Sequence, residues 1–67
     1  MKVLKVIELL SSSKTSWEDA TKNAVKEASK TLKGIKSVYI QDMSATVTDG
    51  EIVEFRVNAK ITFEIKS

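Results

Sequence analysis

The sequence predicts an α+β fold in which one strand, one helix and a long β-hairpin follow one another along the chain. Three observations predict it: an N-terminal segment rich in branched aliphatic residues, a central segment with apolar residues at helical spacing, and a C-terminal half in which apolar and polar residues alternate. The two periods, about 3.6 and 2 residues, distinguish a helix from a strand. We expect a single domain over residues 1–67.

The first element is a predicted strand from about Val3 to Leu10, because Val, Ile and Leu dominate this segment. The polar segment that follows, residues 11–14, has the composition of a loop. Thr15 and Glu18 have the spacing of a capping box, in which the hydroxyl accepts from the amide three residues on and the carboxylate reaches back. Thr15 is therefore the predicted N-cap of the next element.

That next element is a predicted amphipathic helix with an alanine-rich stripe. The stripe consists of Trp17, Ala20, Ala24, Ala28, Thr31, Leu32 and Ile35, with Val25 beside them. The other side carries Lys22, Asn23, Lys26, Glu27, Lys30 and Lys33. Gly34 stands where a C′ glycine would end the helix. Because alanine side chains are short, we expect the packing partner to approach the helix closely.

The dipeptide Asp49-Gly50 predicts a tight hairpin turn between two strands. The second arm alternates without a break, and one of its faces holds Val53, Phe55, Val57, Ala59, Ile61, Phe63 and Ile65. With Asp49 and Gly50 as the loop residues, the register pairs Thr48 with Glu51, Val38 with Ile61 and Ile40 with Ala59. This register places apolar residues of both arms on the core face, whereas a slip by one residue would turn them outward.

The opposite face of the hairpin is expected to be polar at one end and apolar near the turn. In the same register it holds Ser37, Tyr39, Gln41, Met43, Ala45 and Val47 against Thr62, Lys60, Asn58, Arg56, Glu54 and Ile52. The apolar patch lies outside the core of one subunit and consists of Met43, Ala45, Val47 and Ile52. A run from Ile52 to Ile65 is also about twice the usual strand length of ~5–6 residues. Both features favour contact with a second copy of the chain.

The size of the chain favours oligomerisation as well. A domain of this length buries only about 60% of the surface that its unfolded chain exposes, so a lone subunit is marginally stable. Small domains compensate with disulfides, a metal ion or oligomerisation. The sequence contains neither cysteine nor histidine, so oligomerisation is the expected solution.

Composition argues against several classes of function. Without His, Cys, a Gly-rich phosphate loop or a nucleophile elbow, we expect no enzyme. Glu8, the carboxylate that interrupts the first apolar strand, is interpreted as a solvent-facing or ion-pairing residue. The formal charge is only +2 and the lysines form no run, which argues against nucleic acid as a partner.

The sequence also predicts the compartment. No segment approaches the ~20 apolar residues of a membrane span. The N-terminal apolar run carries charges and no small-residue cleavage site, so we expect no signal peptide. We therefore expect a cytoplasmic, soluble protein without a membrane partner.

Several local strings resemble the dodecin family across nearly the whole chain. They are Lys5-Val6-Ile7-Glu8-Leu9, Thr15-Ser16-Trp17-Glu18-Asp19-Ala20, the segment from Ala28 to Leu32, the Asp49-Gly50 turn and the ending from Val57 to Ile65. The resemblance implies a β-α-β-β subunit with a three-stranded antiparallel sheet wrapped around one helix. It also implies a spherical homododecamer with 23 cubic symmetry.

The resemblance further implies a flavin ligand (FMN, FAD or riboflavin), because dodecins stack pairs of isoalloxazine rings at subunit interfaces. The family's stacking tryptophan lies at the start of the second strand, where this chain has Ser37. The family's flavin-contacting glutamine follows an aromatic residue of the third strand, where this chain has Arg56 after Phe55. Asp42 falls where the family has an acidic residue near the ligand. Serine in place of the tryptophan and arginine in place of the glutamine both weaken the flavin interpretation.

Two hypotheses follow for a non-enzymatic protein. In the first, a dodecin-type shell stores or sequesters a flavin or another anionic cofactor at subunit interfaces. Arg56 then pairs with phosphate or ring oxygens, while Ser37, Tyr39 and Asp42 line the site. In the second, the shell is a flavin-free structural or divalent-cation-binding particle.

A branch of the family known as calcium dodecins supports the second hypothesis. It resembles this chain in lacking the tryptophan and in having an arginine at the position of Arg56. The string Gln41-Asp42-Met43 is also similar, with an offset of two residues. The sequence has no acidic calcium loop, so a cation site would gather Asp42 or Glu54 from symmetry-related subunits.

Overall fold

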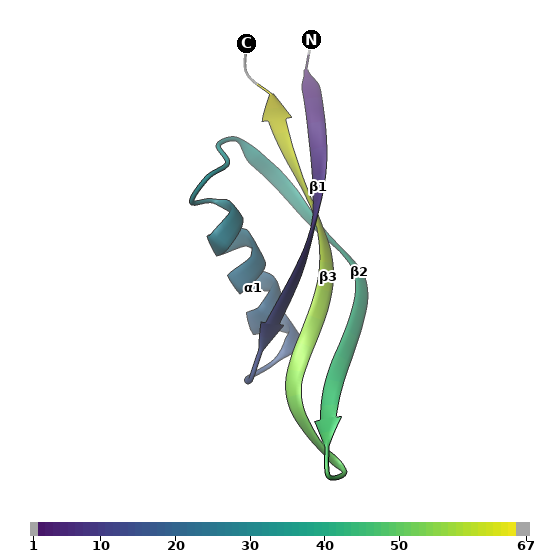
Figure 1. Ribbon diagram of the computed structural model, residues 1–67. Helices are drawn as coiled ribbons and strands as arrows, with labels where there is room; N and C mark the ends of the chain where they lie inside the picture. The colour runs from purple at the N-terminus through teal and green to yellow at the C-terminus, as the bar shows by residue number, and fades with distance from the viewer. Residues whose placement is uncertain (1, 66–67) are drawn as a thin grey trace.

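The structure, a computed structural model, describes residues 2–65. Its elements are β1 (Val3–Ser13), α1 (Trp17–Ala28), β2 (Ile35–Thr48) and β3 (Glu51–Ile65). The three strands form one antiparallel sheet in the order β1-β3-β2 (Figure 1). The predicted α+β class and the β-α-β-β order are confirmed.

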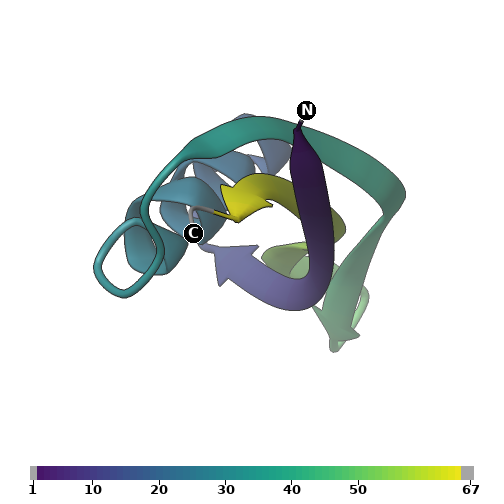
Figure 2. The ribbon, with the colours of Figure 1, turned by 90° about the horizontal axis from the view of Figure 1, so that it is seen from above.

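The sheet is strongly curved and α1 lies on its concave side, as the view along the molecule shows (Figure 2). The helix packs mainly against β1 and β3. Its contact face consists of Ala20, Ala24 and Ala28, all of which are buried. Opposite them, β3 buries Val57, Ala59 and Ile61. These six small and branched residues are all the buried apolar side chains of residues 2–65.

Buried and exposed residues alternate in the centre of β3 but not at its two ends. Phe55 and Phe63 are only half-buried, and the outermost members of the predicted core face, Val53 and Ile65, are exposed. The cause is the length of the helix, which does not cover the ends of the strand.

The turn between β1 and α1 differs from the prediction. Residues Ser11 to Ser13 continue β1 instead of forming a loop. Ser13 is buried, and its hydroxyl accepts from the amide of Thr15 at 2.9 Å and donates to the Asp19 carboxylate at 2.6 Å. The N-cap is Ser16, whose Oγ accepts from the Asp19 amide at 2.9 Å. The prediction of Thr15 as N-cap was wrong by one residue, because Ser13 already holds the Thr15 amide.

The helix ends earlier than predicted. Its last residue is Ala28, and Ser29 follows as the C-cap with its hydroxyl bonded to the Val25 carbonyl at 2.7 Å. The predicted stripe residues Thr31, Leu32 and Ile35 therefore lie outside it. Gly34 does adopt the left-handed conformation expected of a C′ glycine, with φ of +78°. It opens β2 instead of closing the helix, and its carbonyl accepts from the Glu64 amide at 3.0 Å.

The predicted register of the hairpin is confirmed at both ends and wrong in the middle. Thr48 pairs with Glu51, Val38 with Ile61 and Ile40 with Ala59, as predicted. Between them the register shifts at Gln41 and again between Thr46 and Val47. The middle pairs are therefore Met43 with Val57, Ser44 with Arg56 and Ala45 with Phe55. The first shift inserts Gln41 into β2 and the second inserts Val53 into β3. Such bulges increase the local twist, which the hairpin needs to follow the curved sheet.

The strands are much longer than the helix that covers them. Twelve helical residues span about 18 Å, whereas the fifteen residues of β3 span about 50 Å. The molecule accordingly measures 51 × 19 × 13 Å, and the β2–β3 hairpin extends well beyond α1 (Figure 1). Met43, Val47 and Ile52 are exposed in this extension, whereas Ala45 is half-buried. The predicted apolar patch is therefore largely exposed. The prediction that it lies on the face opposite the core was wrong for Met43 and Ala45, because the bulge at Gln41 pairs them with the helix-facing residues Val57 and Phe55.

Candidate functional site

The face of the sheet opposite α1, which we call the outer face, is not covered by any part of the described chain. Since Val57, Ala59 and Ile61 point toward the helix, the residues between them point outward. The outer face consists of Val6, Glu8, Leu10 and Ser12 from β1, Ser37, Tyr39, Asp42 and Ser44 from β2, and Arg56, Asn58, Lys60 and Thr62 from β3.

The pairing places each outward residue of β3 between one residue of each edge strand. Thr62 lies between Val6 and Ser37, Lys60 between Glu8 and Tyr39, Asn58 between Leu10 and Asp42, and Arg56 between Ser12 and Ser44. All four residues predicted to line a ligand site therefore share this one face. Sequence reasoning identified their face correctly for Ser37, Tyr39 and Arg56.

Asp42 reaches the outer face only because of the bulge at Gln41. In the predicted register, an even-numbered residue of β2 would have pointed toward the helix, beside Val38 and Ile40. The extra residue reverses the alternation, so Asp42 pairs with the outward-facing Asn58. One inserted residue in β2 thus places the carboxylate on the same surface as the Tyr39 ring.

The four residues do not form one compact cluster. Ser37 pairs with Thr62, whereas Arg56 lies six residues further along β3. At about 3.3 Å per residue this separation is about 20 Å. Tyr39 and Asp42 occupy the interval between them. A ligand of ordinary size cannot touch Ser37 and Arg56 of the same chain at once.

Three features of the outer face suit contact with another molecule. Tyr39 is 64% exposed, and the apolar residues Leu10 and Val6 are 71% and 54% exposed. The side-chain oxygen of Asn58 is buried and has no hydrogen-bond donor among the described residues. An orphaned buried acceptor is costly, at about 1–3 kcal/mol, so it calls for a donor from outside the chain.

Sequence reasoning placed Asn58 and Lys60 on this face without giving either a role in a site, and it did not identify Leu10 as a member. Asn58 and Lys60 were recognisable as outward residues of β3, but nothing in the sequence showed that the Asn58 oxygen would be buried. The position of Leu10 depends on the pairing of β1 with β3, which local sequence does not reveal.

The described part of the chain offers no cluster of carboxylates for a metal ion. Within residues 2–65, no three Asp or Glu side chains lie close enough together to hold an ion. Asp42 and Glu54 are the two carboxylates named from the sequence. Asp42 pairs with Asn58, which lies four residues from Glu54 along β3. That spacing corresponds to about 13 Å. In addition, no helix of the described segment is long and apolar enough to cross a membrane.

Comparison with known proteins identifies the fold. The Dodecin family model matches residues 3–66. Among solved structures, a variant of the Thermus thermophilus dodecin superimposes with a TM-score of 0.95, at 25% identity and with 100% of both chains covered. The match extends over all four elements, so the predicted wrapping of the sheet around one helix is the arrangement of that dodecin too.

A second relative is a calcium dodecin of Mycobacterium tuberculosis. Its sequence is 27% identical over 66 residues, which are 98% of this chain and 93% of the relative. Its crystal structure, described as that of a calcium-chelating antigen with a novel calcium-binding site, superimposes with a TM-score of 0.84 at 29% identity, covering 96% of this chain and 91% of that one. With a family match over almost its entire length, this chain belongs to the dodecin family.

Proposed function

We propose that this protein assembles from identical copies into a dodecin-type shell and binds a small anionic ligand, a flavin or a related cofactor, where outer faces of two copies meet. The observation that carries the proposal is the outer face itself. It presents an exposed Tyr39 ring, an exposed Arg56 and exposed aliphatic side chains, and no element within residues 2–65 covers it. A surface of this composition is typical of an interface and not of a solvated sheet.

Contact between the outer faces of two copies, related by a two-fold axis, would bring the separated site residues together. In an isologous interface each residue appears twice, related by the symmetry axis. Antiparallel apposition of two outer faces then brings the Arg56 end of one copy over the Ser37 end of the other. The residues that lie about 20 Å apart in one chain become neighbours across the interface. The site is complete only in the assembly.

The chemistry of the residues favours an anionic, partly aromatic ligand. The Arg56 guanidinium offers a planar pair of donors that matches a phosphate or the oxygens of a ring. Tyr39 offers a ring for stacking, worth about 0.5–1.5 kcal/mol beyond the buried area. Ser37 contributes only a hydroxyl, so affinity for a flavin should be lower than with an indole there. Asn58 and Asp42 accept hydrogen bonds from N–H or O–H groups of the ligand.

Native mass spectrometry of protein purified without added ligand tests assembly and binding together. Twelve copies of the 7.4 kDa chain give about 89 kDa (12 × 7.4 kDa). A particle of this mass with flavin-sized or nucleotide-sized excess mass is the expected result. A monomer or dimer across micromolar concentrations contradicts the assembly. An empty dodecamer that also fails to bind added FMN, FAD or riboflavin contradicts the ligand.

The role of Arg56 is tested with a matched control on the helix. Arg56→Ala removes one exposed positive charge from the outer face, and Lys26→Ala removes one from α1 without breaking an observed ion pair. We expect Arg56→Ala to weaken binding of FMN at least tenfold and Lys26→Ala to leave it unchanged. Equal effects of the two variants would indicate general electrostatic attraction and would exclude a specific contact.

Divalent-cation binding is the second candidate, favoured by the similarity to a protein named calcium dodecin. Carboxylates from two or more copies would have to meet, because Asp42 and Glu54 are too far apart in one chain. Calorimetric titration of the assembled protein with Ca²⁺ is the test. Saturable binding that Asp42→Asn abolishes supports this function, whereas heat signals that Asp42→Asn leaves unchanged exclude Asp42 from the site.

A further inference from the structure

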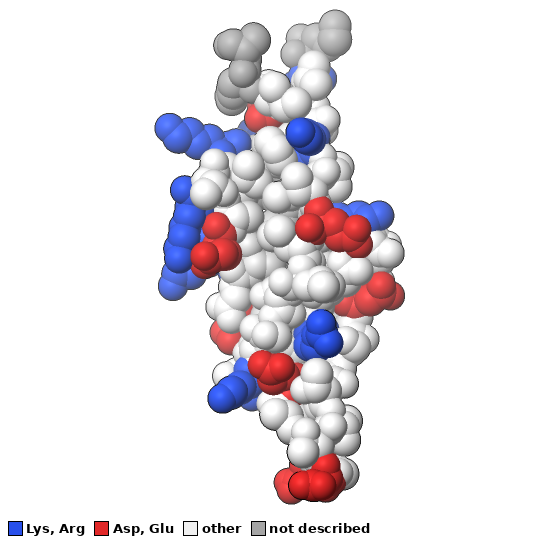
Figure 3. Space-filling model, in the orientation of Figure 1, with Lys and Arg blue, Asp and Glu red and all other residues white. Residues whose placement is uncertain are grey.

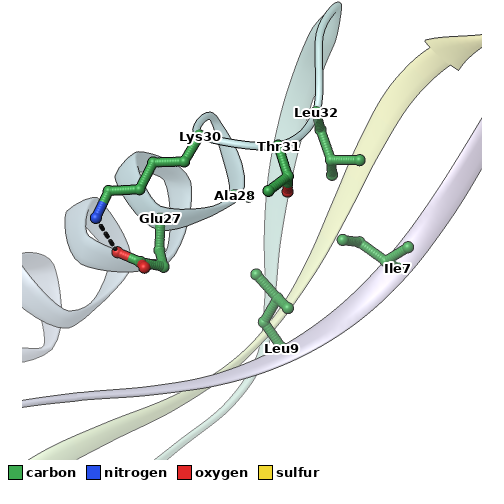
Figure 4. A pocket seen from close by; sticks show the side chains of 7 residues that line it. All are labelled: Ile7, Leu9, Glu27, Ala28, Lys30, Thr31 and Leu32. Carbon is green, nitrogen blue, oxygen red and sulfur yellow. Dashed lines mark ion pairs between the residues drawn. The ribbon is translucent and has the colours of Figure 1, made fainter.

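A continuous groove runs along the helix side of β1. One pocket of about 350 Å³ lies between β1 and the end of α1 and is lined by Ile7, Leu9, Ala28 and Leu32, with Glu27, Lys30 and Thr31 at its rim. A second, of about 320 Å³, shares Leu9 and Glu27 with it and continues along Ser11, Asn23 and Ala24. The side chains of Ile7, Leu9 and Leu32 point into the same space (Figure 4). The groove is apolar, open, and bounded by an edge strand.

The hairpin tip, residues 47–53, has the complementary composition. Val47 is 62% exposed, Ile52 56% and Val53 44%, so three aliphatic side chains project at the end of a narrow two-stranded arm. Val47 and Ile52 are direct partners in the register, which places them side by side. The arm extends beyond the end of the helix (Figure 1).

Charge is also divided between these two regions. Residues 30–36 carry Lys30, Lys33 and Lys36 and no acidic residue. Residues 49–54 carry Asp49, Glu51 and Glu54 and no basic residue. In the space-filling view acidic side chains cover the hairpin end and others lie over the middle of the molecule, whereas basic side chains lie along the outer side of α1 (Figure 3). Lys30 and Lys36 form ion pairs with Glu27 and Glu64 of the same chain. Lys33 adds a further positive charge there, and this charge attracts the acidic end of the hairpin at long range.

We propose that the hairpin tip of one copy docks into the groove between β1 and the end of α1 of a second copy. Val47 and Ile52 fill the apolar pocket beside Leu32, and the acidic residues of the tip face the lysines that follow α1. The contact joins two different surfaces, so it is heterologous and closes into a ring when the rotation permits. The proposal rests on the assembly proposed above and specifies one of its interfaces, distinct from the ligand-binding contact between outer faces.

The two regions cannot meet within one chain. Ile7 of the groove pairs with Ile61, and Ile52 lies nine residues further along β3. This separation is about 30 Å on a continuous strand. A covalent link between tip and groove can therefore form only between two copies. Since the sequence has no cysteine, two introduced thiols are the only ones present.

Disulfide trapping of the assembled protein tests the contact. The variant carrying Ile52→Cys and Leu32→Cys is oxidised and separated without reductant, and a short bismaleimide is used in parallel because a disulfide needs Cα atoms within about 4.4–6.8 Å. We expect covalent dimers, trimers and higher species. Ile52→Cys alone and Leu32→Cys alone are expected to stay monomeric on the gel. In the double variant each chain carries one cysteine in its tip and one in its groove, so it can be linked to two neighbouring copies.

The other arrangements give different outcomes, and each overturns the proposal. Cross-linking through Ile52→Cys alone indicates contact between two tips, and cross-linking through Leu32→Cys alone indicates contact between two grooves. Absence of cross-links in a variant that native mass spectrometry shows to be assembled means that the tip docks elsewhere. A parent chain that does not assemble refutes the proposed function itself, which separates that failure from this one.

Charge exchange supplies an independent test that does not use cysteine. Asp49→Lys with Glu51→Lys should raise the protein concentration needed for assembly at least tenfold. Adding Lys30→Glu and Lys33→Glu should restore assembly to near the parent value. Adding Lys22→Glu and Lys26→Glu instead makes the same change of charge nearer the start of α1 and should not restore it. Equal behaviour of the two combinations would exclude pairing between the tip and the end of the helix.

Discussion

The indole nitrogen of Trp17 donates a hydrogen bond to the carbonyl oxygen of Ser44 at 2.8 Å. This bond joins the first residue of α1 to β2 just beyond the bulge at Gln41. The indole ring also meets the ring of Phe55 edge to face, with centroids 4.8 Å apart and an interplanar angle of 75°. One side chain thus connects the helix to both strands of the hairpin where the helix stops covering them.

Removal of this connection should loosen the hairpin without unfolding the helix. Trp17→Phe retains a ring against Phe55 but loses the donor to Ser44, and we expect a loss of about 1 kcal/mol in the free energy of unfolding. Trp17→Ala should cost about 2–3 kcal/mol, somewhat below the values for fully buried aromatic residues because Trp17 is half-buried. Urea denaturation at one fixed protein concentration measures both, since assembly contributes to stability. Equal midpoints for parent and Trp17→Phe would show that the hydrogen bond contributes nothing.

The start of the helix allows the two candidate caps to be separated. Ser16→Ala removes the acceptor for the Asp19 amide and should cost about 1 kcal/mol. Thr15→Ala should change stability by less than about 0.5 kcal/mol, because Thr15 is exposed and its hydroxyl makes no observed bond. The two variants are measured by the same denaturation. A larger loss of stability from Thr15→Ala than from Ser16→Ala would show that Thr15 is the N-cap, as predicted from the sequence.

Ser13 should be the most sensitive of the three hydroxyl residues. Its buried Oγ bonds to the Asp19 carboxylate and to the Thr15 amide, so Ser13→Ala removes one hydrogen bond from each of them. We expect a loss of about 1–3 kcal/mol. Ser12→Ala, one residue earlier and exposed on the outer face, is the matched control. Similar effects of the two changes would mean that the Ser13 network does not stabilise the turn.

This network shows why the helix start could not be predicted to the residue. Five hydroxyl residues precede Trp17 with one lysine among them, and each hydroxyl is chemically able to cap a helix. The choice is made by β1, which continues as far as Ser13 because it pairs with Phe55 of a strand distant in sequence. Once Ser13 is buried, its oxygen takes the Thr15 amide and Ser16 becomes the cap. Local spacing alone contains none of this information.

The hairpin shows the same division between local and distant causes. The turn and the pairs Val38 with Ile61 and Ile40 with Ala59 follow from Asp49-Gly50 and from alternation, and both were predictable. The bulge at Gln41 follows from the curvature of the sheet around α1, and no glycine marks it in the sequence. Consequently the face of Tyr39 could be predicted from periodicity. The face of Asp42 could not, although the family resemblance had placed it near the ligand.

Two glycines with nearly equal backbone angles should respond differently to substitution. Gly34 and Gly50 have φ of +78° and +79°. Gly50→Asn should be close to neutral, because asparagine tolerates this region and the space around Gly50 is open. Gly34→Asn should cost at least 1 kcal/mol, because a Cβ there lies 3.4 Å from the Glu64 carbonyl oxygen and a longer side chain must pass that strand. Thermal unfolding compares the two, and equal transition temperatures would show that the approach of Glu64 imposes no constraint.

Introducing the missing indole tests whether the outer face retains the geometry of a flavin site. Ser37→Trp should strengthen binding of FMN or riboflavin by about ten- to a hundredfold, since about 0.5–1.5 kcal/mol of stacking plus buried area is gained at each of two symmetry-related positions and each 1.4 kcal/mol is a factor of ten. Quenching of flavin fluorescence during titration gives the dissociation constant. Lys26→Trp is the matched control, because it adds the same side chain at an exposed position of α1, away from the outer face and without breaking an observed ion pair. If Ser37→Trp assembles normally and binds no better than Lys26→Trp, the outer faces meet in a geometry that does not accept a stacked ring, and the anionic ligand must then be one that Arg56 holds without stacking.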